Sequence, residues 1–145
     1  MKYKYNLLIR LLLAFILALL GSKIFFFLFS DVTFYFSYFL LRDYNPIIIN
    51  NNLVIGNLNL EFVSACVATS AYVLLSILIL LTKDIDLKKS IKIFVAGALT
   101  IFLVNVFRIT ILAYLLIEYG IELFNTLHLF IWEVFATIFV FLLWL

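Results

Sequence analysis

Apolar residues fill long stretches of this chain with few polar interruptions, so the hydrophobic pattern predicts helices that are apolar on all sides. Four runs are long enough, at about 1.5 Å per residue, to cross a hydrocarbon core of roughly 30 Å. Inside lipid each backbone amide has to be satisfied within its own segment, which requires helices there. The predicted spans are residues 6–29, 62–81, 91–117 and 123–145.

Residues 30–61 separate the first two runs and fall into two parts. The stretch "DVTFYFSYFLLRDY" (31–44) is rich in Tyr and Phe, so we expect an interfacial segment along the outer membrane surface rather than a fifth span. The stretch "NPIIINNNLVIGNLNLEF" (45–62) has short β-branched runs punctuated by Asn and Gly, which predicts one or two short strands with a turn. A substrate-facing hairpin and an ordinary surface loop both fit this pattern.

The composition supports a membrane class. Hydrophobic residues make up 68% of the 145 positions and charged residues only 12%, whereas a soluble domain keeps about a quarter of its residues charged. We therefore expect an all-α membrane protein, with residues 1–145 forming one bundle of four transmembrane helices and no second domain. The chain has a single cysteine, which excludes an internal disulfide.

The distribution of positive charge predicts the orientation. Seven of the ten Lys and Arg residues lie at the N-terminus or in the loop "TKDIDLKKSIK", and short basic loops stay cytoplasmic. Both termini are then expected inside the cell and residues 30–61 outside. The basic start before a long apolar run resembles a signal peptide, but no clear small-residue cleavage site follows, so we expect an uncleaved first span.

Three chemically distinctive residues fall at a similar depth under this topology. Counted from the outer ends of their runs, Cys66, Arg108 and His128 lie about 6, 13 and 8 Å deep. A base and a fixed positive charge activate a thiol, and a guanidinium stabilises an oxyanion, so the trio predicts a catalytic cysteine site. An intramembrane arginine costs about 2.5 to 3.5 kcal/mol on insertion scales, so its charge requires a partner, a cavity or a function.

Smaller polar residues surround each member of the trio at helical spacing. Asn105 lies three residues before Arg108, on the same helix face, where its amide would orient the guanidinium or the substrate. Two further groups flank the other candidates: Asn125 beside His128, and Thr69 and Ser70 after Cys66. Glu133 is five residues from His128 and is turned about 140° away on a helix.

A non-catalytic interpretation stays open. A lone cysteine in a span commonly packs as a small hydrophobe, and a lone histidine near a helix end is commonly an interfacial polar group. Arg108 would then pair with Glu118 or Glu133 across helices in a transporter subunit or assembly factor. One Cys and one His do not build a metal site, and the sequence predicts no cofactor, no metal and no nucleic-acid partner.

Three motifs, "EFVSACVATSAYVLL", "LVNVFRITILAYLL" and "FNTLHLFIWEVFATIFVF", give the chain a resemblance to the exosortase and archaeosortase family, as a short member. The resemblance implies a prokaryotic membrane transpeptidase with Cys66 as nucleophile beside Arg108 and His128. It also implies substrates that are exported proteins ending in a short motif, an apolar span and a basic tail. The cleaved chain would pass as a thioester to the amine of a membrane lipid.

Overall fold

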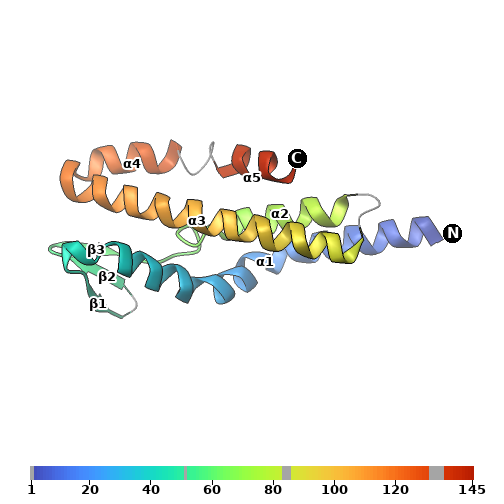
Figure 1. Ribbon diagram of the computed structural model, residues 1–145, viewed down its shortest axis with the longest axis horizontal. Helices are drawn as coiled ribbons and strands as arrows, with labels where there is room; N and C mark the ends of the chain where they lie inside the picture. Colours follow the sequence, from blue (N-terminus) through green and yellow to red (C-terminus); the bar gives the residue numbers. More distant parts are fainter. Residues whose placement is uncertain (1, 51, 83–85, 131–135) are drawn as a thin grey trace.

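The computed structural model describes residues 2–50, 52–82, 86–130 and 136–145 (Figure 1). The molecule is mostly helical and elongated, with a small sheet at one end and both chain termini toward the other. In chain order the elements are α1 (Lys2–Leu40), the 3-10 turn η1 (Arg42–Tyr44), β1 (Ile47–Ile49), β2 (Asn52–Ile55), β3 (Leu58–Leu60), α2 (Thr69–Leu81), α3 (Leu87–Tyr119), α4 (Ile121–Phe130) and α5 (Ala136–Trp144).

Two helices of the described chain are long and apolar enough to cross a membrane. They cover Leu8–Leu40 and Lys88–Tyr119, whereas α2 is apolar but has only 13 residues, about 20 Å. An apolar stripe on the outer face of α3 is half or more exposed and repeats every four residues: Ile91, Val95, Leu99, Leu103, Phe107 and Ile111. The mostly helical architecture is as predicted, while the four-span bundle stays a prediction.

The first helix continues past its predicted end at residue 29, so that boundary is wrong. Residues 30–40, expected as an interfacial segment, continue α1 without a break. Thr33, Phe34 and Ser37 are buried on its inner side, and the Ser37 hydroxyl donates to the Thr33 carbonyl within the helix. The helical pattern is broken only at η1 and Pro46, because no Gly or Pro lies between Ser22 and Asn45.

The stretch 45–62 forms three strands, one more than the largest number predicted. They make an antiparallel sheet in the order β1-β2-β3, with Ile47 opposite Val54 and Leu53 opposite Leu60. Gly56 adopts a positive φ of 58° in the tight turn between β2 and β3, as a two-residue hairpin turn requires. One face of β2 is buried in a cluster that joins the sheet to α1 and α3: Phe34, Leu41, Leu53, Ile55 and Ala113.

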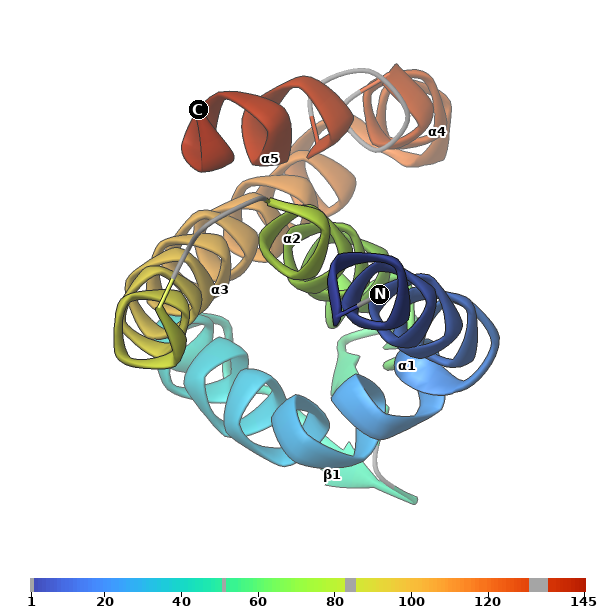
Figure 2. The same ribbon diagram turned by 90° about the vertical axis from the view of Figure 1, so that its right-hand side faces the viewer.

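The main core forms where α2 lies between α1, α3 and α5 (Figure 2). Tyr72 and Leu75 of α2 are completely buried, and the Tyr72 ring stacks on Phe29 of α1 with centroids 4.4 Å apart. Gly97 of α3 faces α2 and α5 so closely that a Cβ there would lie 2.6 Å from a methyl group of Leu75. Packing of α2 against three other helices therefore fixes the position of its N-terminal end.

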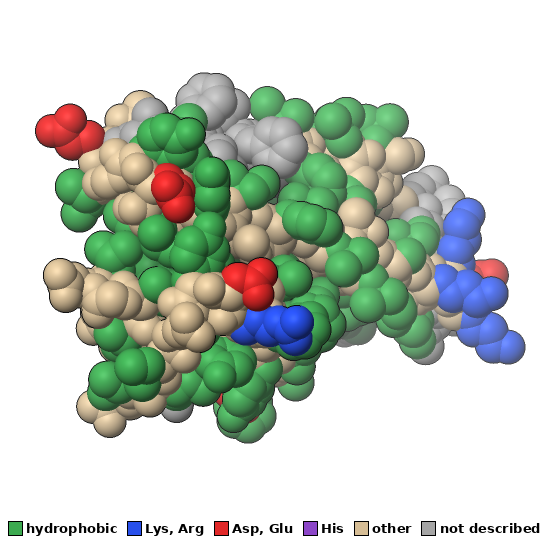
Figure 3. All heavy atoms as spheres, turned by 60° about the vertical axis from the view of Figure 1, so that its left-hand side comes forward, with side chains coloured by type: hydrophobic (Ala, Val, Ile, Leu, Met, Phe, Trp, Pro, Cys, Tyr) green, Lys and Arg blue, Asp and Glu red, His purple; other side chains and the backbone are tan. Residues whose placement is uncertain are grey.

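Exposed charges are unevenly distributed along the molecule. Figure 3 shows a group of Lys and Arg side chains at one end, acidic side chains mainly toward the other end, and a further basic group beside an acidic one between them. Three exposed lysines lie in the first two turns of α3, Lys88, Lys89 and Lys92, and the exposed acidic residues near the sheet and the end of α3 include Asp43, Glu61, Glu118 and Glu122. The sidedness predicted from the basic loop stays a prediction.

The basic end is held together around Thr82, at the C-terminus of α2. Arg10 of α1 donates to the Thr82 carbonyl at 2.8 Å, and the Trp144 indole of α5 donates to the Thr82 hydroxyl at 3.0 Å. A cation is favourable at this helix end because the last carbonyls lack helical partners. The third predicted span, 91–117, lies within α3, so its helical structure is as predicted, while the membrane crossing stays a prediction. The fourth, 123–145, contains residues 131–135, which lie outside the described chain, so its continuity stays a prediction.

Candidate functional site

Cys66 lies in a compact turn rather than on a helix, which corrects the predicted helix start at residue 62. Residues 64–68 form consecutive turns, with the Cys66 amide bonded to the Val63 carbonyl at 2.8 Å and the Val67 amide to Ser64 at 3.3 Å. Ala68 then adopts a left-handed conformation with φ 56° and ψ 36°, which no residue inside a right-handed helix can have. Helix α2 therefore begins only at Thr69.

Side chains bind three successive carbonyls of this turn. The Thr69 hydroxyl donates to Ser64 O at 3.4 Å, the Arg108 guanidinium donates to Ala65 O at 3.2 Å, and the Asn105 amide donates to Cys66 O at 2.6 Å. Irregular backbone within a mostly apolar bundle needs such partners, because unpaired polar groups are costly away from water. The turn is therefore held by one donor from the helix that follows it, α2, and by two donors from α3.

Asn105 and Arg108 lie on one face of α3, as their spacing of three residues predicts. Asn105 is buried, and Arg108 is partly buried. Their donors reach adjacent carbonyls, so the Asn-x-x-Arg pair acts as a two-point clamp on the turn that carries Cys66. The sequence analysis expected the Asn105 amide to orient the Arg108 guanidinium or a substrate. In the structure, both side chains instead bind backbone carbonyls of the cysteine turn.

The thiol of Cys66 is half-buried, and its Sγ lies 3.6 Å from the Glu61 carbonyl oxygen. The Arg108 guanidinium binds the carbonyl of the preceding residue, Ala65, which brings a positive charge to the cysteine turn. The hydrogen bonds put the turn beside Asn105 and Arg108, in the middle of α3, and residues 61–68 reach this position as irregular chain.

The remaining predicted residues fall into three groups. Thr69 is buried and has a structural position, since its hydroxyl also lies 3.0 Å from the Ser22 hydroxyl of α1. Ser70 and Asn125 are exposed, and Asn125 lies on α4 three residues before His128. The backbone of His128 belongs to α4, but its side chain is outside the described part of the structure, as is the whole of Glu133.

Sequence reasoning missed two residues that shape the site. Ser22 contacts Thr69 and ties α1 to the start of α2, and its polarity within the apolar run 6–29 was a usable signal. Ala68 provides the left-handed turn that ends the cysteine turn, and alanine gives no signal for that conformation. The position of Ala68 becomes intelligible only from the packing of α2 and the donors from α3.

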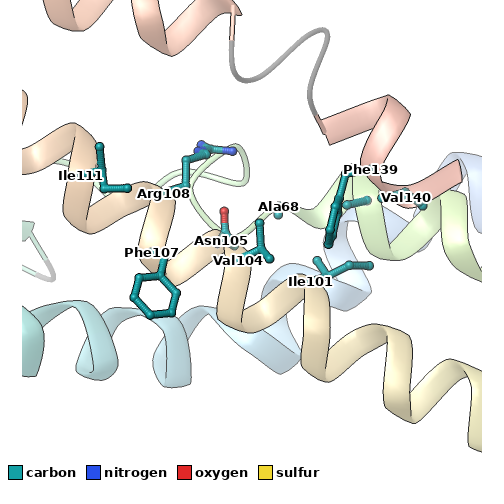
Figure 4. Close-up of a pocket in the computed structure, with 10 residues that line it drawn as sticks. Ala68, Ile101, Val104, Asn105, Phe107, Arg108, Ile111, Phe139 and Val140 are labelled. Carbon is teal, nitrogen blue, oxygen red and sulfur yellow. The ribbon is translucent and has the colours of Figure 1, made fainter. Parts of the chain in front are cut away.

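A pocket of about 340 Å³ adjoins the turn, between the start of α2, the middle of α3 and α5 (Figure 4). Its walls are apolar apart from Asn105 and Arg108, and the other lining residues are Ala68, Ala71, Ile101, Val104, Phe107, Ile111, Phe139 and Val140. In Figure 4 the Asn105 oxygen and the Arg108 side chain point to the same side of α3, toward the loop that contains Ala68. This volume lies near the lower end of the range of small-molecule sites, about 300–1,000 Å³.

Two further expectations concern ions. Arg108 and Glu118 both belong to α3 and are ten residues, about 15 Å, apart along its axis, too far for a direct ion pair. No three residues of the His, Cys, Asp and Glu types gather as a metal site among the residues that the structure describes.

Comparisons with known proteins give no family for the chain: no protein-family model, no curated protein and no solved structure matches it. Any functional conclusion therefore depends on the chemistry of the site and on the motif resemblance.

Proposed function

We propose that the protein is a membrane-embedded cysteine protease or transpeptidase with Cys66 as its nucleophile. The observation that carries the proposal is the pair of bonds from Asn105 and Arg108 to the carbonyls of Cys66 and Ala65, which hold the turn that carries the cysteine and bring a positive charge to it. A nucleophile has to be held rigidly and activated by its surroundings. A turn of small residues clamped from an adjacent helix meets the first requirement, and the guanidinium contributes to the second.

In the proposed reaction the Cys66 thiolate attacks the carbonyl carbon of a substrate peptide bond. The carbon–nitrogen bond breaks, the leaving amine takes up the proton that the thiol lost, and a thioester remains on Cys66. An acceptor amine then attacks the thioester, the carbon–sulfur bond breaks, and the acceptor's proton leaves through the base. His128 is the proposed base, and Arg108 is proposed to stabilise the oxyanion of each tetrahedral intermediate.

The proposed substrates are exported proteins that end in a short motif, an apolar span and a basic tail, and the proposed acceptor is the amine of a membrane lipid. The proposed topology has four spans, with both termini cytoplasmic, the sheet outside and the site toward the outer face of a prokaryotic cell membrane. The exposed lysines at the start of α3 and the acidic residues toward the sheet end support this orientation.

The direct test measures processing of a tailed substrate in cells. The reporter is an exported protein from the same genome that ends in an apolar span and a basic tail. Cys66→Ala should abolish the mobility shift that marks its cleavage, while Ser64→Ala, in the same turn, should leave it intact, because the Ser64 hydroxyl is not among the groups that bind the turn. If the Cys66→Ala variant processed the reporter at the normal rate, the proposal that the protein is a cysteine enzyme would be wrong.

A second candidate is a small non-catalytic membrane protein, such as a transporter subunit or assembly factor. The observation that favours it is that Asn105 and Arg108 bind backbone carbonyls, which gives the intramembrane charge a structural reason. The two candidates differ in their dependence on sulfur. Cys66→Ala leaves both carbonyl bonds in place, so the non-catalytic protein would keep its cellular function in that variant and lose it when Asn105 is replaced.

A further inference from the structure

A second pocket lies at the end of the molecule where α3 begins, opposite the end that carries the sheet. Its volume is about 510 Å³, and it lies between the N-terminal half of α1, the C-terminal half of α2 and the first two turns of α3. Figure 2 faces this end of the molecule and shows α2 between α1 and α3. Arg10 and Ser90 belong to its polar lining, and Leu17, Ile91 and Phe94 belong to its apolar lining.

The polar part of the pocket has hydrogen-bond donors to offer a ligand. Arg10 donates from one nitrogen, Nη1, to the Thr82 carbonyl at 2.8 Å, and a guanidinium has five N–H donors. Ser90 lines the same pocket, and its hydroxyl forms no hydrogen bond with a described residue. No described residue forms an ion pair with Arg10, while Asp84 lies outside the described chain. Donors beside a fixed positive charge suit a ligand with several acceptor oxygens, such as a phosphate group.

Further positive charge lies along the chain on both sides of Ser90. Three exposed lysines, Lys88, Lys89 and Lys92, flank it in the first two turns of α3. Asp86, directly before α3, is the single acidic residue in the described stretch 86–94. Positive charge therefore exceeds negative charge at this end of α3, which favours a ligand with a net negative charge.

The division of the pocket into a polar and an apolar part coincides with the start of two apolar runs. Arg10 directly precedes the run 11–20 of α1, and Ser90 directly precedes Ile91, the first residue of the exposed apolar stripe of α3. In a bilayer this is the level at which headgroups meet hydrocarbon. Leu17 and Phe94 line the pocket about 10 and 6 Å further along their helices. A phospholipid matches both parts, whereas a free phosphate would leave the apolar walls uncovered.

We propose that this pocket binds an anionic phospholipid, with its phosphate at Arg10 and Ser90 and an acyl chain along Leu17, Ile91 and Phe94. Basic pockets between membrane helices commonly hold lipid headgroups in this way. Ile91 is 55% exposed, so the chain reaches the pocket from the surrounding lipid. The inference rests on the membrane location contained in the proposed function and is independent of the chemistry at Cys66.

The test measures lipid binding to the full-length protein in a neutral detergent by native mass spectrometry. The probes are dioleoyl phosphatidylglycerol, which is anionic, and dioleoyl phosphatidylcholine, which has the same acyl chains and phosphate but no net charge. We expect the anionic lipid to bind about tenfold or more tightly, the worth of one hydrogen bond to a charged group. Inorganic phosphate in millimolar excess should not displace it.

Two matched pairs of variants check the position of the lipid. Arg10→Gln should weaken binding of phosphatidylglycerol by about tenfold or more, while Arg42→Gln, which removes the same charge at the sheet end, should leave it unchanged. Leu17→Trp fills the apolar part and should also weaken binding, whereas Leu19→Trp, at an exposed position of the same helix, should not. The leucine pair keeps the bond from Arg10 to Thr82, so it decides the matter if Arg10→Gln does not fold.

Three results would overturn the lipid site. The first is equal binding of the two lipids, and the second is equal affinity within either pair of variants. The third is displacement of phosphatidylglycerol by inorganic phosphate, which would assign the polar part of the pocket to a free anion.

The outcome is separable from that of the proposed function because binding is measured without turnover. If the anionic lipid binds as expected but Cys66→Ala processes the tailed reporter normally, the lipid site stands and the enzyme is wrong. If processing depends on Cys66 but the two lipids bind equally, the enzyme stands and the lipid site is wrong.

Discussion

The amide of Asn105 donates a 2.6 Å hydrogen bond to the carbonyl oxygen of Cys66, across 39 positions of the chain. This bond joins the middle of α3 to a turn that would otherwise have an unpaired carbonyl inside an apolar bundle. A polar side chain in a membrane helix commonly bonds to a neighbouring helix. Here the partner is irregular backbone, so the residue determines where the cysteine lies.

Replacing Asn105 by Leu should loosen the cysteine turn. The substitution keeps an apolar side chain of similar size but leaves Cys66 O without its donor, at a cost of about 1–3 kcal/mol. We expect hydrogen exchange in a peptide covering residues 62–70 to accelerate by about fivefold or more. Asn125→Leu, at an exposed position of α4, is the control and should leave that exchange unchanged. If hydrogen exchange in residues 62–70 were unchanged in Asn105→Leu, the bond from Asn105 to Cys66 O would not stabilise the turn.

Arg108→Lys tests the guanidinium itself. Lysine keeps the charge but not the planar fork, so the bond to Ala65 O and the geometry beside the thiol should not both survive. The loss of one charged hydrogen bond predicts that processing of the tailed reporter falls by about tenfold or more. Arg42→Lys, at the exposed sheet end, should process normally. Full activity in Arg108→Lys would show that the positive charge of the residue is sufficient and that the planar guanidinium is not needed.

The long apolar helices could be predicted from the sequence because length and hydrophobicity are enough to indicate them, and α3 contains its predicted range. Once α3 is a helix, the spacing of three residues puts Asn105 and Arg108 on one face, as predicted. The start of α2 was not readable, because the left-handed Ala68 is compatible with an apolar run. The donors that hold the turn before Ala68 lie 39 and 43 residues after the carbonyls of Cys66 and Ala65 that they bind. The sequence predicted that Arg108 and Cys66 would lie near each other, and in the structure the Arg108 side chain binds the carbonyl of Ala65, the residue before Cys66. The sequence could not distinguish the thiol from the neighbouring carbonyls as the group that the side chain binds.

Gly97→Leu should disrupt the packing of three helices. A Cβ at this position already meets methyl groups of Leu75 and Leu143 at 2.6 and 2.9 Å, and a whole leucine side chain has no space there. Overpacking of a well-packed core typically costs about 1–3 kcal/mol, so the detergent-solubilised protein should melt at a lower temperature. Ala96→Leu adds a similar side chain at the adjacent exposed position and should melt like the parent protein. Equal melting of the two variants would mean that α2 and α5 do not pack on Gly97.

Single cysteines test whether the chain crosses the membrane between the sheet and the start of α3. In a Cys66→Ala background, Asn57→Cys lies at the exposed tip of the sheet and Lys88→Cys in the basic first turn of α3. These sites lie toward opposite ends of an elongated molecule, as Figure 1 shows, although the helix between them, α2, has only 13 residues. An impermeant charged maleimide added to intact cells should label Asn57→Cys, and should label Lys88→Cys only after permeabilisation.

The same reagent gives a second reading on the parent protein. Wild-type Cys66 should react faster from outside than from the cytoplasmic side, because the turn enters the bundle directly after the sheet.

Labelling of both Asn57→Cys and Lys88→Cys from the same side of the membrane would show that α2 and residues 61–68 do not complete a crossing. Labelling of Lys88→Cys alone from outside would reverse the orientation and put the basic loop on the side that the positive-inside rule excludes.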